Sequence, residues 1–134
     1  MNQVLQMKQN KYLEMTVQTA TPAQLLLMLY DGAIRFCKLG IEGIKENDIQ
    51  KKHVNLTKAQ NIVYELIASL DRSIPISDSL LSLYDYFIHR LTEANLKKDV
   101  EPAEEVLGYL VELKQTWAQA AASVNKHATG VTHG

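Results

Sequence analysis

Apolar residues recur at intervals of three and four along most of the chain, which is the spacing of one face of an α-helix. Four segments show this period, and polar or turn-forming residues separate them. No segment shows the strict alternation that is typical of a half-buried strand. We therefore predict helices over residues 22–46, 49–71, 78–98 and 100–124.

Residues that favour helix ends flank these segments. Thr21 can cap the first helix, and Pro22 fits the first helical position, where its missing N–H would have no partner. Asp48 can cap the second helix, and Ser77 or Asp78 can cap the third. These residues predict where three of the four helices begin.

The four predicted helices are about 20–25 residues long, and short segments connect them. Helices joined in this way pack as neighbours that run in alternating directions. We predict an all-α fold, an antiparallel up-and-down four-helix bundle over residues 21–124. Residues 1–20 show no regular period, and we expect an extended N-terminal segment that packs on the bundle. Residues 125–134 are rich in polar residues and Gly, and we expect a flexible C-terminal tail.

The first predicted helix has more apolar surface than two neighbouring helices can cover. At about 100° per residue, its charged residues form one narrow stripe and apolar residues occupy nearly all of the rest. A bundle helix normally exposes about half of its circumference to water, so something further must cover this one. Residues 1–20 are one possible cover, and a helix of another protein is the other.

The N-terminal segment has a composition that suits a displaceable lid. Three of the four methionines, Met1, Met7 and Met15, lie in it, and thioether side chains adapt to varied apolar contacts. The segment is too polar for a core element and too apolar for a free linker. An ordinary tail behind a start codon is the alternative interpretation.

Composition and charge exclude several classes of protein. The chain has 134 residues, 46% of them hydrophobic, with a net charge of -1 and a single cysteine, which indicates one small domain. Such a balance of charges attracts neither nucleic acid nor an anionic membrane. The longest apolar run, Leu25–Tyr30, is far shorter than the roughly 20 residues that span a bilayer. With one cysteine and no leader pattern, we expect a cytoplasmic protein without membrane insertion.

Motifs for catalysis and metal binding are missing from the sequence. It has no phosphate loop, no H-E-x-x-H and no G-x-S-x-G, and no Glu is followed three residues later by His as in a two-metal bundle site. Asp85 and His89 lie one helical turn apart, but such a pair is more often a surface hydrogen bond than a metal site. We expect no enzymatic activity, no metal and no cofactor.

Two longer motifs resemble the family of the flagellar export chaperone FliS. The first is Thr19–Pro22 followed by Met28–Ile34 (MLYDGAI), and the second is Leu83–Leu91 (LYDYFIHRL). The stretch Lys58–Ile62 and Trp117 are similar to the family as well. The resemblance covers roughly residues 10–120, which is nearly the whole chain.

This resemblance implies a cytosolic chaperone that works without ATP and binds the disordered C-terminal segment of flagellin in apolar grooves, one to one. Such a chaperone prevents premature polymerisation and delivers flagellin to the flagellar type III export gate through the FlhA cytoplasmic domain. The alternative is a structural helical-bundle protein that self-associates through the first helix and the N-terminal tail.

The resemblance and the helical pattern together indicate a cargo groove and its lid. In the family, a tyrosine shortly before the first helix packs into the cargo groove of the empty chaperone, and Tyr12 matches it. The candidate residues for groove and lid are Tyr12, Met15, Val17, Leu25, Met28, Leu29, Gly32, Phe36, Ile62, Tyr84 and Tyr86.

Overall fold

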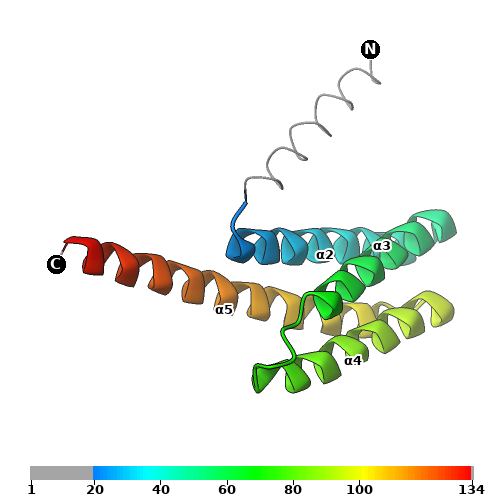
Figure 1. The fold of residues 1–134 in the computed structure, drawn as a ribbon. Helices are drawn as coiled ribbons and strands as arrows, with labels where there is room; N and C mark the ends of the chain where they lie inside the picture. The colour runs from blue at the N-terminus through cyan, green and yellow to red at the C-terminus, as the bar shows by residue number, and fades with distance from the viewer. Residues whose placement is uncertain (1–19, 134) are drawn as a thin grey trace, which may run out of the picture.

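The computed structural model describes the backbone of residues 20–133 and the side chains of residues 20–124. It contains the helices α2 (Pro22–Lys45), α3 (Ile49–Ala68), α4 (Ile76–Lys97) and α5 (Val100–His133). The helices α2 and α4 each pack against α3 and α5, so they lie diagonally across the bundle (Figure 1). This confirms the predicted all-α four-helix bundle. The predicted packing of the N-terminal segment lies outside the described residues.

The first two helices begin where the sequence predicts. Thr21 and Gln24 form a capping box, in which the Gln24 backbone N–H donates to Thr21 Oγ1 at 3.2 Å and the Thr21 N–H donates to Gln24 Oε1 at 2.9 Å. At the start of α3, the Lys51 N–H donates to Asp48 Oδ1 at 3.0 Å. These caps satisfy backbone donors that have no partner within their own helix.

The predicted cap of α4 is wrong. The helix begins at Ile76 behind Pro75, no side chain caps it, and Ser77 is buried inside it. The preceding turn is organised instead by Asp71, whose Oδ1 accepts from the Ser73 N–H at 3.0 Å. Because Pro75 already has helical backbone angles, the chain enters the helix before it reaches the residues suited to capping. Likewise, α3 ends at Ala68 instead of residue 71.

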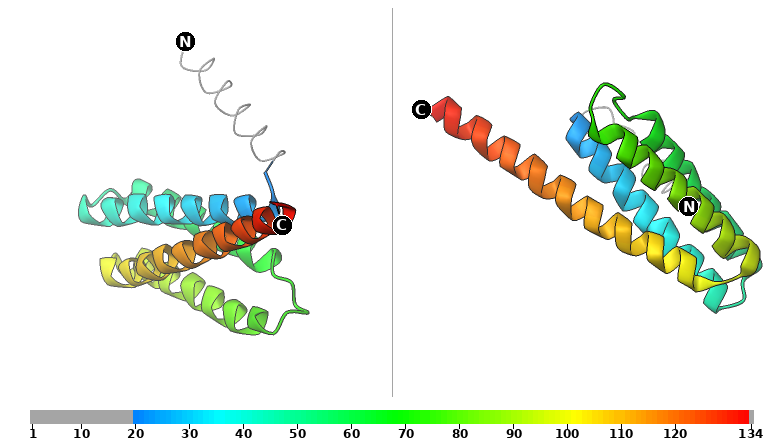
Figure 2. Two further views of the ribbon diagram at one scale, coloured as in Figure 1. Left: turned by 90° about the vertical axis from the view of Figure 1, so that its left-hand side faces the viewer. Right: turned by 90° about the horizontal axis from the view of Figure 1, so that it is seen from below.

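The predicted end of the last helix is also wrong. α5 continues to His133, whereas the sequence predicted a helix that ends at residue 124 and a flexible tail after it. Residues 125–133 contain no proline and one glycine, Gly130, so nothing in them blocks the helical hydrogen-bond ladder. As a result, α5 projects beyond the ends of the other three helices (Figures 1 and 2).

The core lies between the four helices, and three aromatic rings are its largest members. Tyr30 from α2 and Tyr84 and Phe87 from α4 are buried, and the hydroxyl groups of Tyr30 and Tyr84 lie 2.5 Å apart in a hydrogen bond. Burial raises the pKa of both tyrosines, so both stay protonated and share this bond. The pair joins the diagonal helices α2 and α4 through the centre of the bundle.

A glycine lets α2 and α3 approach each other closely near the turn that joins them. A Cβ atom at Gly43 would lie 2.4 Å from the backbone nitrogen of Lys52, which is too close for any real contact. Gly108 in α5 differs, because a Cβ atom there would meet nothing within 4 Å. The same substitution by alanine at the two glycines therefore compares a crowded position with an open one.

Replacing Gly43 with alanine should lower the free energy of unfolding by about 2 kcal/mol, since the Lys52 backbone must move. Gly108→Ala is the control and should raise it by about 0.5–1 kcal/mol, because alanine is the better helix former and has free space there. Urea unfolding followed by circular dichroism measures both values. Equal effects of the two substitutions would show that the close approach at Gly43 does not limit packing.

Candidate binding grooves beside α2

An apolar groove lies between the N-terminal half of α2 and the C-terminal end of α3. Its volume is about 670 Å³, and we call it the α2–α3 groove. Residues of α2 spaced three and four apart share one side of the helix and form most of its lining. The lining residues are Pro22, Leu25, Leu26, Met28, Leu29, Glu65 and Ser69.

A second groove of about 630 Å³ lies on the other side of the same part of α2, and we call it the α2–α5 groove. Leu26 and Leu27 face Trp117 and a series of alanines of α5 across it. Alanine side chains are too short to fill the space between the two helices. Pro22 and Leu26 line both grooves, so the two grooves flank the beginning of α2.

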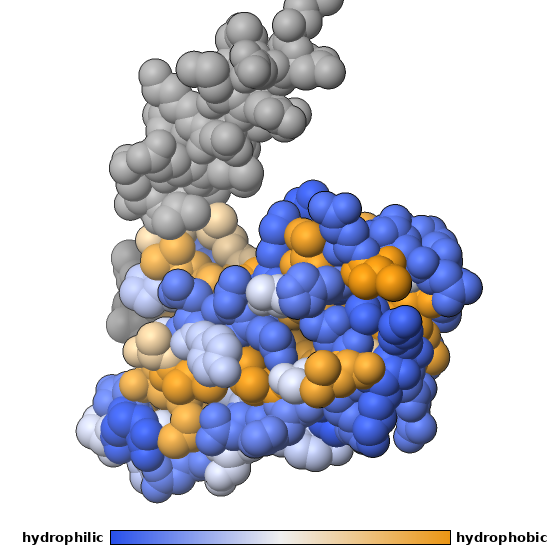
Figure 3. All heavy atoms as spheres, turned by 90° about the vertical axis from the view of Figure 1, so that its right-hand side faces the viewer, coloured by the Kyte–Doolittle hydropathy of each residue, from blue (hydrophilic) through white to orange (hydrophobic). Residues whose placement is uncertain are grey.

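The apolar surplus of α2 explains why both grooves are there. The run Leu25–Leu29 consists of five large apolar side chains in succession, and each of them is only half-buried. Because α2 packs mainly on α3 and α5, the side chains between and beyond these contacts stay partly exposed. On the face seen in Figure 3, hydrophobic surface lies in patches among polar side chains.

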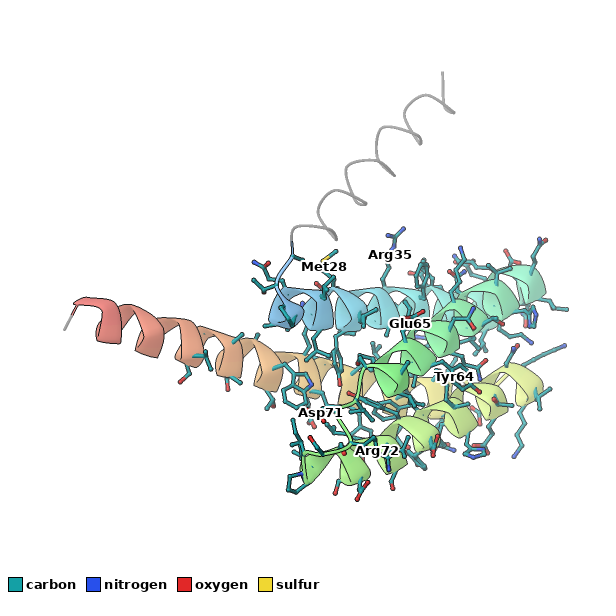
Figure 4. The ribbon with its side chains drawn as sticks, viewed as in Figure 1. Met28, Arg35, Tyr64, Glu65, Asp71 and Arg72 are labelled. Carbon is teal, nitrogen blue, oxygen red and sulfur yellow. The ribbon has the colours of Figure 1, made fainter. Side chains whose placement is uncertain are left out.

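Six of the predicted groove residues lie along one seam. Leu25, Met28 and Leu29 line the α2–α3 groove, and Met28 projects from the outer side of α2 (Figure 4). Gly32 continues the seam, because a Cβ atom there would lie 2.9 Å from Cδ1 of Ile62 on α3. Phe36 follows one turn later on α2, beside Lys58 of α3. The structure therefore brings Leu25, Met28, Leu29, Gly32, Phe36 and Ile62 together.

Tyr84 and Tyr86 are not brought to this seam. Tyr84 is 2% exposed and lies in the core, where it bonds Tyr30. Tyr86 is 40% exposed, and its hydroxyl group donates to the Glu105 carboxylate of α5. Both belong to α4, which lies diagonally opposite α2.

The other three predicted residues, Tyr12, Met15 and Val17, lie outside the described residues.

The sequence reasoning missed the groove residues that other helices contribute. Glu65 lies in the last turn of α3 and Ser69 follows the end of that helix, whereas Trp117, Ala118 and Ala121 come from α5. A signal was present for α5, since a succession of alanines next to a tryptophan marks a helix face with little side-chain volume. Its position beside α2 depends on a contact between segments about 90 residues apart.

Two kinds of reactive group were considered among the described residues, a metal cluster and the single cysteine. No three His, Cys, Asp or Glu side chains among them lie close enough to hold a metal ion. Burial raises the pKa of the Cys37 thiol to about 12, and Sγ donates to the Ala103 carbonyl oxygen at 3.3 Å. Such a thiol is protonated at neutral pH and is a poor nucleophile.

None of the helices in the described range combines the length and apolar content that crossing a bilayer requires.

Fold and surface together define a class: a helical bundle whose distinctive surface is a pair of apolar grooves beside one helix. The sequence was compared with models of known protein families. The family model "Flagellar protein FliS" matches residues 4–124. The chain belongs to the FliS family.

Several flagellar secretion chaperones named FliS are similar to the chain over most of its length. The protein of Bacillus subtilis (strain 168) is 42% identical over 119 residues, covering 89% of this chain and 90% of that protein. Those of Salmonella typhimurium and Escherichia coli (strain K12) are 38% and 34% identical and cover 79% and 82% of this chain, and 81% and 83% of their own lengths. Membership of this family supports a chaperone role in flagellar export and implies a non-enzymatic protein.

Proposed function

We propose that this protein is a cytoplasmic chaperone that works without ATP and binds the disordered C-terminal segment of flagellin in the grooves beside α2. Binding there keeps the segment from polymerising early and allows delivery to the flagellar type III export gate through the FlhA cytoplasmic domain. The observation that carries the proposal is the half-buried apolar run Leu25–Leu29 with a groove on each side.

The size and position of the grooves suit a segment that orders on binding. Ordering a disordered segment costs several kcal/mol, so its binding site needs a large apolar contact. The grooves of about 670 and 630 Å³ share Pro22 and Leu26, so one segment can follow α2 on both sides. The net charge of -1 leaves apolar burial as the main attraction.

In this proposal the N-terminal segment acts as a lid over the grooves. α2 begins at Pro22, which itself lines both grooves, so the preceding residues join the bundle at the groove ends. Tyr12, Met15 and Val17 supply the apolar side chains of the lid. A lid of this kind competes with cargo, and removing its aromatic anchor should change cargo affinity.

Calorimetric titration with a synthetic flagellin C-terminal peptide tests the proposal. We expect a one-to-one complex with a negative heat-capacity change, which is the mark of apolar burial. A scrambled peptide of the same composition is the control. A Tyr12→Ala variant in the same titration tests the lid, and its affinity should differ from that of the wild type. Absence of binding at tens of micromolar peptide would contradict the proposal.

Self-association through α2 is the competing explanation for the apolar surplus. It requires a second copy to cover the same grooves, and therefore predicts a dimer without affinity for flagellin. Light scattering of the purified protein over a range of concentrations, with and without the peptide, separates the two. A stable dimer that ignores the peptide would favour self-association.

A further inference from the structure

Two cationic side chains flank the Phe36 ring, where the seam between α2 and α3 continues beyond the α2–α3 groove. Arg35 Cζ lies 5.5 Å from the ring centroid, and Lys58 Nζ lies 5.3 Å from it. Phe36 is half-buried, whereas both cations are exposed. Cations at this distance are attracted to the ring face, which holds them beside the seam.

Neither cation forms an ion pair with a carboxylate among residues 20–124. The acidic residues nearest to Arg35 along α2 are engaged elsewhere. Asp31 pairs with Lys114 at 2.5 Å, and Glu42 pairs with Lys51 at 3.2 Å. The Phe36 end of the seam therefore carries two positive charges that are available to a ligand.

The other end of the seam has the opposite charge. Glu65 lines the α2–α3 groove beside Met28 and forms no ion pair within the described side chains. Met28 and Arg35 project from the same side of α2, and Glu65 lies on the neighbouring α3 (Figure 4). The seam therefore has an apolar and acidic end at Met28 and Glu65, and a basic and aromatic end at Phe36. A segment that lies along it contacts both ends.

We propose that the seam selects an amphipathic cargo helix with an Asp or Glu side chain about two turns from its apolar anchor, and that Arg35 and Lys58 bind this carboxylate. This rests on the function proposed above. Met28 and Phe36 are eight residues apart, which is about 12 Å along α2 at 1.5 Å per residue, and a docked helix covers that length with eight residues. The reverse direction would bring the carboxylate against Glu65. The charges therefore fix the direction of docking as well as the composition of the cargo.

Charge reversal at Lys58 tests this inference. In titrations with the flagellin C-terminal peptide, Lys58→Glu should weaken binding about fivefold, mainly by slowing association, because charges at the rim of a contact act on the association rate. Lys38→Glu is the matched control: Lys38 is exposed, lies on α2, forms no ion pair within residues 20–124 and does not contact Phe36. It should leave binding unchanged within about twofold.

A second peptide makes the test independent of folding defects. When every Asp and Glu of the peptide is replaced by Lys, the Lys58→Glu variant should bind this peptide more tightly than the wild type does. Equal weakening of binding by Lys58→Glu and Lys38→Glu would overturn the inference. Amidating the C-terminus of the peptide removes its terminal carboxylate. If only this change weakened binding, the cations would bind the chain end and not a side chain, and the inference would also be overturned. If the wild type binds but both variants bind equally well, this inference fails alone. If the wild type binds no peptide, the proposed function fails and this inference with it.

Discussion

Replacing Met28 with glutamate should weaken binding of the flagellin C-terminal peptide about 100-fold while the bundle stays folded. Met28 lines the α2–α3 groove and is half-buried, so its side chain contributes to the groove surface more than to the core. A glutamate there would become an unpaired charge beneath an apolar ligand, and its desolvation costs several kcal/mol. A 100-fold loss corresponds to about 2.7 kcal/mol. Calorimetry gives the affinity, and circular dichroism confirms the fold.

Two variants control this result. Leu96→Glu introduces the same charge on α4, where the side chain is 79% exposed, and should leave peptide binding unchanged. Met28→Leu keeps an apolar side chain of similar volume in the groove and should bind within a few-fold of the wild type. Binding by Met28→Glu at wild-type strength would remove the α2–α3 groove from the proposed function.

Replacing Phe87 with alanine should lower the free energy of unfolding by about 3–5 kcal/mol, the range seen when a buried phenylalanine is truncated. Phe87 is fully buried, and its ring centroid lies 6.1 Å from that of Tyr84 and 5.8 Å from that of Tyr109. Truncation leaves a cavity between α4 and α5 that rigid helices cannot close. Urea unfolding of the full chain measures the change.

The control for Phe87 lies on the same helix. Leu96→Ala removes a large apolar side chain that is 79% exposed, so it should change the free energy of unfolding by less than about 0.5 kcal/mol. A loss below about 1 kcal/mol for Phe87→Ala would mean that the core of the bundle relaxes around the cavity.

The substitutions of Met28 and Phe87 separate surface from core. The candidate groove residues respected this distinction on α2 but not on α4. On α2, the excess of apolar positions indicated a helix with uncovered surface, and the run Leu25–Leu29 is half-buried. On α4, the resemblance and the helical pattern together put Tyr84 among the groove residues, whereas its side chain is in the core. Periodicity shows which residues share a face, but it does not show what that face contacts.

Some helix ends could be predicted from the sequence and others could not. Thr21 and Asp48 cap α2 and α3 as predicted, because a capping hydrogen bond involves residues only three apart in the chain. The start of α4 was not predicted, since it depends on how the turn at Asp71 delivers Pro75 to the helix. The end of α5 was not predicted either, because polar residues are compatible with both a helix and an irregular tail.

The sequence by itself determined the helical bundle, the caps of its first helices, the apolar surplus of α2 and the resemblance to the FliS family. These properties are carried by periodicity, local hydrogen bonds and contiguous motifs. Only the tertiary structure decided that α3 and α5 flank α2, that Trp117 and Glu65 line grooves with its leucines, and that Arg35 and Lys58 meet at Phe36. The physical reason is that a groove is the space left between helices, and its lining depends on their packing.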